Sequence, residues 1–375
     1  MRPPVYLDYN ATARLRPQAR EAALAAMAIG ANPSSVHADG RAARMAIEDA
    51  RAAVANLVGA PRAAVTFVSG GAEANALAIA SAVAAGCERI LVSAGEHDSV
   101  LADAQASGVG VDIWPTRSDG TADLGWLAER LAGPKALVCL MLANNETGVV
   151  QPAAEAAALA RAAGAWLHVD VVQAAGKIPV SLAALGADTL ALSAHKLGGP
   201  AGAGALAAAQ RARLTPMLRG GGQERGFRAG TENLAGVAGF GAAAGAALAE
   251  IGAPADQGAW RDRLARTVQA AGAVVLGEAA PRLNQTLCFA TPGFSSELQV
   301  MALDLAGVMI SAGAACSSGK VRASRVVQAM GRPDLAPFSV RVSGGWASRE
   351  ADWIACGEAW LEAHERWAAR ARRVA

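Results

Sequence analysis

The feature that most constrains this chain is an alternation of short apolar runs with longer alanine-rich stretches of helical pattern. The runs have the length of buried strands, which we expect at residues 64–68, 90–93, 111–114, 136–142, 166–170, 189–193 and 203–207. Helical patterns lie between several of them, at 72–85, 98–107 and 153–163. This alternation predicts an α/β fold, a mainly parallel sheet with helices on both faces. Ligands of such folds bind beyond the carboxyl ends of the strands.

The pattern changes after a helical stretch at 231–251. We expect a helix at 257–271, strands at 282–289 and 339–342, and a long closing helix at 349–372. These elements predict a smaller α+β domain. We assign residues 15–252 to a large domain, and residues 1–14 with 253–375 to the small one.

Composition excludes several classes of function. Of the 375 residues, 53% are hydrophobic and 18% charged, so a sizeable core is expected. The net charge of +2 gives no argument for nucleic acid or for an anionic membrane. The five cysteines are odd in number and lack a C-x-x-C pair, which argues against a zinc site or a disulfide framework. No secretory signal or membrane span is recognisable, and we expect a cytoplasmic protein.

One lysine lies where a solvated lysine would not be expected. Lys196 occurs in SAHKLGGPAG (193–202), just beyond an apolar run and before a glycine-rich loop. An amine near a low-dielectric pocket loses its preference for charge, so its pKa falls and it becomes a nucleophile that can form a Schiff base. Ser193 and His195 alternate at the strand end and could bind an anion beside it. A structural salt bridge is the alternative.

Two further polar features follow predicted strands. The stretch Ser69-Gly70-Gly71-Ala72-Glu73 joins a strand to a helix, where backbone N–H groups can hold an anion; a plain turn is the alternative. Asp170 ends a buried strand and needs a cation or hydrogen-bond donors, unless it only caps a helix. Gln173 could reach the same space. His168 is interpreted as a hydrogen-bonded core histidine.

Together these features provide an anion cradle, a carboxylate and an imine-forming lysine. Pyridoxal 5'-phosphate needs all three, for its phosphate, its pyridine nitrogen and its aldehyde. The residues alone therefore suggest an enzyme that depends on this cofactor.

The chain also resembles the cysteine desulfurases of the nitrogen-fixation and housekeeping type, in the class-V aminotransferase family. The similar stretches run through nearly the whole chain in the family's order: YLDYNAT (6–12), NPSSVH (32–37), SGGAEANALA (69–78), GEHDSV (95–100), NNETGVVQP (144–152), HVDVVQAAGK (168–177), SAHKLGGPAGAGAL (193–206), GGGQERGFRAGTEN (220–233) and SAGAACSSG (311–319). The resemblance implies the pyridoxal-phosphate-dependent transferase fold type I, with a seven-stranded sheet in the large domain.

The resemblance also assigns roles to residues. It implies that Lys196 forms the Schiff base, that Asp170 pairs with the pyridinium nitrogen, that Gln173 binds the ring hydroxyl, and that His97 stacks on the ring. It places phosphate contacts at Ser193, His195 and the Gly71-Ala72 turn, and on Thr231 from the other subunit of a homodimer. Asn145 and Arg341 match residues near the ring and the substrate carboxylate. No metal ligand is implied.

Cys316 is the cysteine that the resemblance singles out. It implies that Cys316 lies in a mobile loop of the small domain and that its thiolate attacks the sulfur of L-cysteine. The products are a persulfide on Cys316 and L-alanine, and His97 carries protons during the reaction. The sulfur then passes to an acceptor such as an iron–sulfur scaffold or a related thiolation pathway. We interpret the other four cysteines as small buried residues.

Two departures and two alternatives remain. Ala72 replaces a common phosphate-binding threonine, so we expect weaker retention of the cofactor, and Ala201 replaces a common lysine. The first alternative is a selenocysteine lyase, or another lyase or aminotransferase of this cofactor class; an aminotransferase has no use for a thiol loop. The second is a degenerate paralogue that acts as a binding scaffold, which the joint presence of Lys196, Asp170 and Cys316 disfavours.

Overall fold

A computed structural model of the chain describes residues 4–251, 256–313 and 323–374. Its larger sheet has seven strands in the order β2-β8-β7-β6-β5-β3-β4. Their bounds are β2 Val65–Val68, β3 Arg89–Ser93, β4 Gly110–Trp114, β5 Ala136–Met141, β6 Trp166–Asp170, β7 Thr189–Ser193 and β8 Gly204–Ala208. The strands from β7 through β6, β5 and β3 to β4 pair in parallel, and only the pairs that involve β8 are antiparallel. The predicted α/β class and mainly parallel sheet are confirmed.

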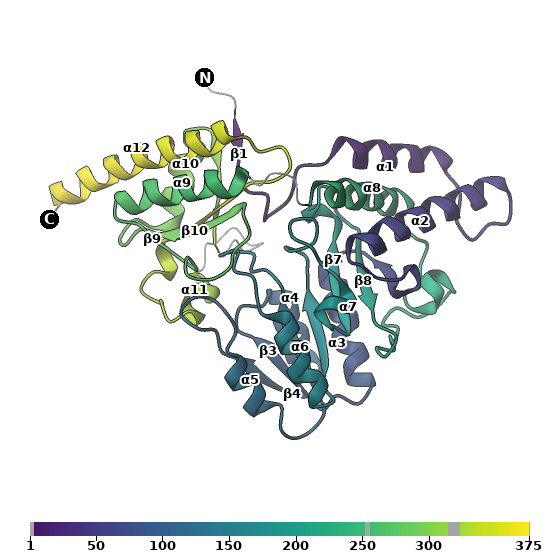
Figure 1. Cartoon of the computed structure of the whole chain (residues 1–375). Helices are drawn as coiled ribbons and strands as arrows, with labels where there is room; N and C mark the ends of the chain where they lie inside the picture. Colours follow the sequence, from purple (N-terminus) through teal and green to yellow (C-terminus); the bar gives the residue numbers. More distant parts are fainter. Residues whose placement is uncertain (1–3, 252–255, 314–322, 375) are drawn as a thin grey trace.

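Helices cover both faces of this sheet (Figure 1). Those that follow its strands are α3 Gly71–Ala84, α4 Asp98–Ala106, α5 Leu124–Arg130, α6 Ala153–Ala162 and α7 Leu182–Leu185. Three more helices, α1 Pro17–Ile29, α2 Ala38–Leu57 and α8 Leu234–Glu250, pack against one another. The predicted start of α8 at residue 231 is wrong, because Asn233 Oδ1 accepts a hydrogen bond from Gly236 N at 3.0 Å and caps the helix one turn later.

A second sheet lies beside the large one, with the strand order β12-β13-β10-β9. Its strands are β9 Val274–Val275, β10 Thr286–Ala290, β12 Ser311–Ala312 and β13 Ser339–Ser343, and its helices are α9 Asp256–Ala270, α10 Ser296–Leu305, α11 Arg325–Ala329 and α12 Glu350–Val374. The predicted strand at 282–289 starts too early, because Arg282 makes only an isolated bridge to Val149 and a turn precedes Thr286.

The N-terminal segment joins this second part of the molecule. β1 Val5–Tyr6 pairs in parallel with β11 Val308–Met309, and Val5 and Leu7 share a core with α9 and α12. The chain then passes towards the large sheet. The division into domains at residue 252 stays a prediction, since residues 252–255 lie outside the described part of the chain.

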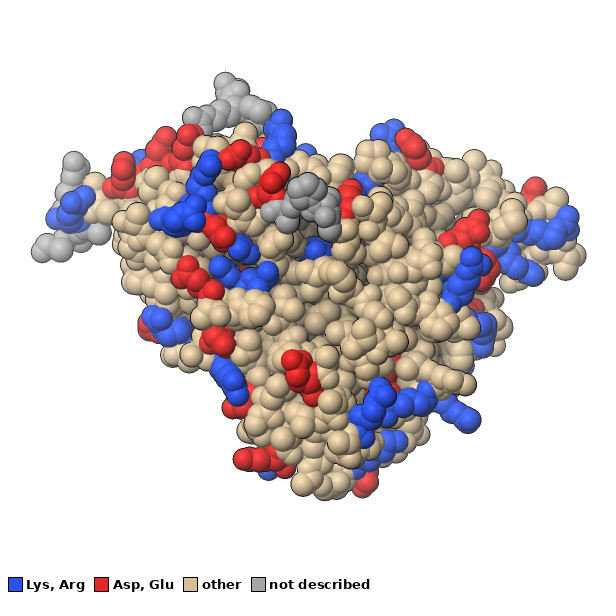
Figure 2. Space-filling view, in the orientation of Figure 1, with Lys and Arg blue, Asp and Glu red and all other residues tan. Residues whose placement is uncertain are grey.

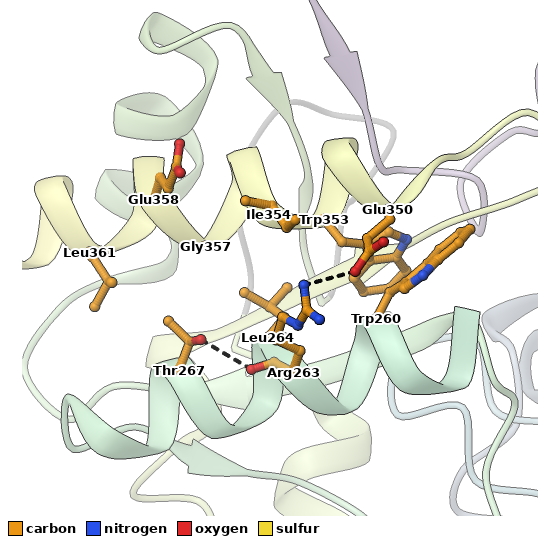
Figure 3. Close-up of a pocket in the computed structure, with 10 residues that line it drawn as sticks. All are labelled: Trp260, Arg263, Leu264, Thr267, Glu350, Trp353, Ile354, Gly357, Glu358 and Leu361. Carbon is orange, nitrogen blue, oxygen red and sulfur yellow. Dashed lines mark hydrogen bonds and ion pairs between the residues drawn. The ribbon is translucent and has the colours of Figure 1, made fainter. Parts of the chain in front are cut away.

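A small hollow of about 190 Å³ lies between α9 and α12 (Figure 3). Trp260, Leu264 and Trp353 contribute its apolar wall, and an ion pair of 2.7 Å joins Arg263 to Glu350 across it. None of the residues that the sequence singled out lines this hollow. It belongs to the packing of the two helices.

Charged side chains of both signs are interspersed around the face shown in Figure 2, whose centre is largely uncharged. Among the described residues, none of the helices combines the length and apolar character that a membrane span requires.

Candidate active site

A cavity of about 850 Å³ lies at the carboxyl ends of the parallel strands, where residues from both sheets meet. Ten of the residues that the sequence singled out line it: Gly71, Ala72, His97, Asn145, Asp170, Gln173, Ser193, His195, Lys196 and Arg341. Thr231 is exposed and does not line it. Cys316 lies outside the described residues.

Lys196 ends a single 3₁₀ turn, Ala194–Lys196, that directly follows β7. Its Nζ donates hydrogen bonds to the carbonyl oxygens of Asn10, at 2.5 Å, and Ala11, at 2.9 Å. Burial, then the positive charge of Arg341, lowers the pKa of Lys196 to about 8, against the opposing effect of Asp8 and Asp170. The amine is therefore more easily deprotonated than an exposed lysine.

Asp170 is the last residue of β6 and is buried. Its Oδ2 accepts a hydrogen bond from Asn75 Nδ2 at 3.0 Å, and its Oδ1 accepts one from Val172 N at 2.9 Å. Asn75 Oδ1 in turn lies 2.9 Å from His168 Nε2, whose other ring nitrogen lies 2.8 Å from Thr189 Oγ1. This chain of bonds fixes the amide of Asn75, so a donor always faces the carboxylate. His168 is the hydrogen-bonded core histidine that the sequence predicted, and burial lowers its pKa to about 3.

His97 is the N-cap of α4, the helix that follows β3. Its Nδ1 accepts a hydrogen bond from Ser99 N at 3.1 Å, which leaves the Nε2 side of the ring as the free end. Because the side chain is exposed within the cavity and its backbone is held by the helix start, the ring forms a fixed wall of the site.

The start of α3 forms another part of the cavity wall. No side chain of the described residues caps this helix. At Gly71 an added Cβ would lie 3.0 Å from Val172 Cγ2 and 3.6 Å from Ser193 Cβ, so glycine keeps this position open. His195 lies nearby, with Nδ1 3.1 Å from Thr12 Oγ1. Burial, then Lys196, lowers the pKa of His195 to about 4, so it is neutral at neutral pH. An uncapped helix start with neutral hydrogen-bonding neighbours suits an anion.

Arg341 reaches the cavity from β13 of the second sheet. Its Nη2 donates to Asp8 Oδ1 at 2.7 Å and its Nη1 to the Asn145 carbonyl at 3.1 Å. Its Nε is buried and has no hydrogen-bond partner among the described residues. A buried guanidinium with an unused N–H can bind a carboxylate.

Sequence reasoning missed several polar residues of the cavity wall, and two of them are fully buried next to the amine or the carboxylate. Asn10, within YLDYNAT, supplies a carbonyl to Lys196 and is 1% exposed. Glu96, within GEHDSV, is also 1% exposed, and its Oε1 has no partner among the described residues. Burial, then the negative charge of Asp170, raises the pKa of Glu96 well above its ordinary value. Both lie in stretches that resemble the family, and this resemblance was the only signal in the sequence that could have pointed to them.

These residues fit pyridoxal phosphate. The cavity presents a buried amine, a carboxylate held by two donors and a helix start on its walls. Its volume of about 850 Å³ lies within the range of small-molecule sites, about 300–1,000 Å³.

The fold is that of a class-V aminotransferase domain, and the family model described as "Aminotransferase class-V" matches residues 5–352. A cysteine desulfurase of Cereibacter sphaeroides is 45% identical over 342 residues, which are 88% of this chain and 87% of that protein. A second relative, the cysteine desulfurase IscS of Dictyoglomus turgidum, is 36% identical, with 94% and 92% covered. The X-ray structure of a NifS-like protein from Rickettsia africae superposes with a TM-score of 0.89 at 31% identity, over 96% of this chain and 99% of that one.

The chain therefore belongs to the cysteine desulfurases of the class-V aminotransferase family. This membership confirms the resemblance and the predicted fold class, and it implies dependence on pyridoxal phosphate.

Proposed function

We propose that this protein is a cysteine desulfurase that converts L-cysteine to L-alanine and holds the sulfur as a persulfide on Cys316, for iron–sulfur cluster assembly or a related thiolation pathway. The observation that carries the proposal is the cavity that brings Lys196, Asp170 and His97 from the large sheet together with Arg341 from the second one. No contact of Cys316 contributes to it, because this residue lies outside the described part of the chain.

Pyridoxal phosphate would be held by residues already in place. Lys196 would bind its aldehyde carbon, Asp170 its ring nitrogen and Gln173 its ring hydroxyl, while His97 would stack on the ring. Ser193, His195 and the backbone of Gly71 and Ala72 would hold the phosphate. When bound, the cofactor supplies an electron sink that stabilises the negative charge left on the substrate Cα after loss of its proton.

The chain's own groups then have distinct tasks. Arg341, through its unpaired Nε, and Asn145 would bind the substrate carboxylate. Lys196 Nζ, whose pKa is near 8, can take up and return a proton at the substrate Cα. The Cys316 thiolate attacks the substrate sulfur; the carbon–sulfur bond breaks as the sulfur–sulfur bond forms. L-cysteine and one thiol become L-alanine and one persulfide, so atoms and charge balance.

A homodimer is part of the proposal. Thr231 is exposed and lies just before α8, the helix that packs against α1 and α2. Large apolar side chains are exposed on α1, on α2 and on the segment between them, among them Met27, Val36 and Met45. A second copy would cover them, and the partner subunit's Thr231 would complete the phosphate site. We also propose a sulfur-acceptor protein, such as an iron–sulfur scaffold, and a cytoplasmic location, which four buried free cysteines support.

The first test is the release of alanine from L-cysteine by the protein loaded with cofactor. We expect alanine from the parent and at most a trace from Cys316→Ala. Cys87→Ala is the matched control, because it removes a buried thiol away from the cavity and should keep the activity. Equal alanine release from the parent and Cys316→Ala would remove the persulfide from the reaction. Failure of the parent to bind the cofactor or release alanine would overturn the proposed function.

A further inference from the structure

A second lysine lies behind the wall of the cavity. The chain has only four lysines among its 34 basic residues, and two of them, Lys177 and Lys196, are in or beside the site. Lys177 does not line the cavity. Its Nζ donates to Gln173 Oε1 at 2.6 Å and to Asn10 Oδ1 at 3.3 Å, so both of these bonds go to amide oxygens of residues that do line it.

The local backbone holds Lys177 in this position. Lys177 lies one helical turn after Gln173, and its N–H donates to Ala174 O at 3.0 Å. Gly176, with a φ of +73°, sets this turn; a Cβ there would lie 2.6 Å from Leu197 Cδ2 and 2.8 Å from Ala247 Cβ. This turn directs the amine towards the side chain of Gln173. It requires glycine at position 176, because of the positive φ and because a Cβ would clash with its neighbours.

A lysine amine fixes the orientation of a neighbouring amide, which a second amide would not do. The two ends of a glutamine amide have nearly the same shape, so the side chain can turn either its oxygen or its nitrogen towards a neighbour. An ammonium group only donates, and even a neutral amine has two N–H groups, one for each of the two oxygens here. Lys177 thus binds the oxygen of Gln173 and directs its NH₂ group the other way.

Within the described part of the chain, the NH₂ group of Gln173 then has one partner and one unused hydrogen. Gln173 Nε2 donates to the Asn10 carbonyl at 2.9 Å, the same carbonyl that Lys196 binds. Gln173 is 4% exposed and lines the cavity, so its second N–H remains as a donor to a group bound there.

We propose that Lys177 is a positioning residue that fixes Gln173 as a hydrogen-bond donor to an acceptor oxygen of the bound cofactor. The inference rests on the proposed function, in which that oxygen is the ring hydroxyl of pyridoxal phosphate. Asn10 is fixed in the same way, since its Oδ1 faces Lys177 while its Nδ2 donates to Asn145 O at 3.1 Å.

The test compares two cofactors on the full-length apoprotein. Dissociation constants are measured by absorbance titration for pyridoxal phosphate and for 3-deoxypyridoxal 5'-phosphate, which lacks only the ring hydroxyl. Lys177→Met should weaken the first by about tenfold, the size of one good hydrogen bond, and leave the second nearly unchanged. Gln173→Ala should show the same selectivity, and Lys177→Met added to Gln173→Ala should cause no further loss.

Lys135→Met is the matched control, because Lys135 is also half-buried and its Nζ donates to a main-chain carbonyl, Ala85 O at 2.9 Å, away from the cavity. It should bind both cofactors as the parent does. Equal losses for both cofactors in Lys177→Met, or no loss for either, would overturn the inference. Should far-UV circular dichroism show that Lys177→Met is unfolded, Lys177→Gln is measured instead, and the same difference between cofactors decides. A parent that binds neither cofactor would instead overturn the proposed function.

Discussion

Groups of opposite sign compete for the charge on Lys196. Arg341 favours the neutral amine, whereas Asp8 and Asp170 favour the ammonium form, and burial decides the balance towards the neutral form. The amine is also tied to two main-chain carbonyls, which holds it in the cavity before any carbonyl compound arrives. Nucleophilicity and position thus come from different neighbours.

This balance predicts a pH dependence for cofactor attachment. Only the neutral amine attacks a carbonyl carbon, and half of the Lys196 amine is neutral when the pH equals its pKa in the folded protein. The rate at which apoprotein gains the visible absorbance of the bound cofactor should therefore rise with pH, with a midpoint near pH 8, and level off well above it. Arg341→Met removes the charge that lowers this pKa, so the midpoint should move to higher pH. A midpoint near the ordinary lysine value of about 10.4 in the parent would contradict the prediction.

At the scale of elements, close helix packing depends on residues without side chains. Gly241 of α8 faces α2, where a Cβ would lie 2.5 Å from Ala50 Cα and 2.6 Å from Ala50 Cβ. Gly245 lies one turn further along the same helix and has open space around its Cα. Both glycines lie within the same helix, but an added Cβ would clash at Gly241 and would meet no neighbour at Gly245.

The same substitution at these two positions should have opposite effects. Gly241→Ala forces α8 and α2 apart and should lower the free energy of unfolding by about 1–3 kcal/mol, the usual cost of overpacking. Gly245→Ala should raise it by about 0.5–1 kcal/mol, because alanine loses less backbone entropy in a helix. Urea unfolding of both variants measures the difference. A stabilised Gly241→Ala would show that the two helices do not pack as closely as the structure has them.

How far the sequence predicts these elements depends on burial. The strands Trp166–Asp170 and Thr189–Ser193 were predicted at their observed bounds, because both are apolar runs that end at a polar residue. The α8 start was not, since Thr231 and Glu232 suit a helix and only the cap at Asn233 excludes them. α1 and α2 were not predicted at all. Asn75 lies within the stretch 69–78 that resembles the family, but its bond to Asp170 was not predicted, because a sequence does not show which side chain of a helix faces a given strand.

At the scale of the whole molecule, one chain leaves the proposed site incomplete. Thr231 is exposed and outside the cavity, and the apolar side chains of the α1 and α2 region have no cover within the described chain. The proposed second copy on this face would account for both features.

A charge placed on this face should therefore separate the subunits and weaken the cofactor site together. Met45 in α2 is 64% exposed and Met301 in α10 is 60% exposed, which makes them a matched pair. Met45→Glu should weaken dimerisation by at least about tenfold in sedimentation, because it buries an unpaired charge, and should lower the affinity for pyridoxal phosphate. Met301→Glu should remain a dimer with the affinity of the parent. Dissociation by Met301→Glu alone would place the subunit contact on α10.

The path of the N-terminal segment also sets the order of events when the protein is made. The carbonyls that hold the Lys196 amine belong to residues 10 and 11. Asn10 N donates to Ser343 Oγ at 3.0 Å, and β1, just before these residues, pairs with β11. Asn10 and Ser343 are 333 positions apart, so at about 5–20 residues per second the ribosome needs roughly 15–70 s to supply the second after the first. A nascent chain or a C-terminally truncated fragment lacks this support for the amine. Because Arg341 also lies on β13, only a chain synthesised past this strand can complete the wall of the cavity around Lys196.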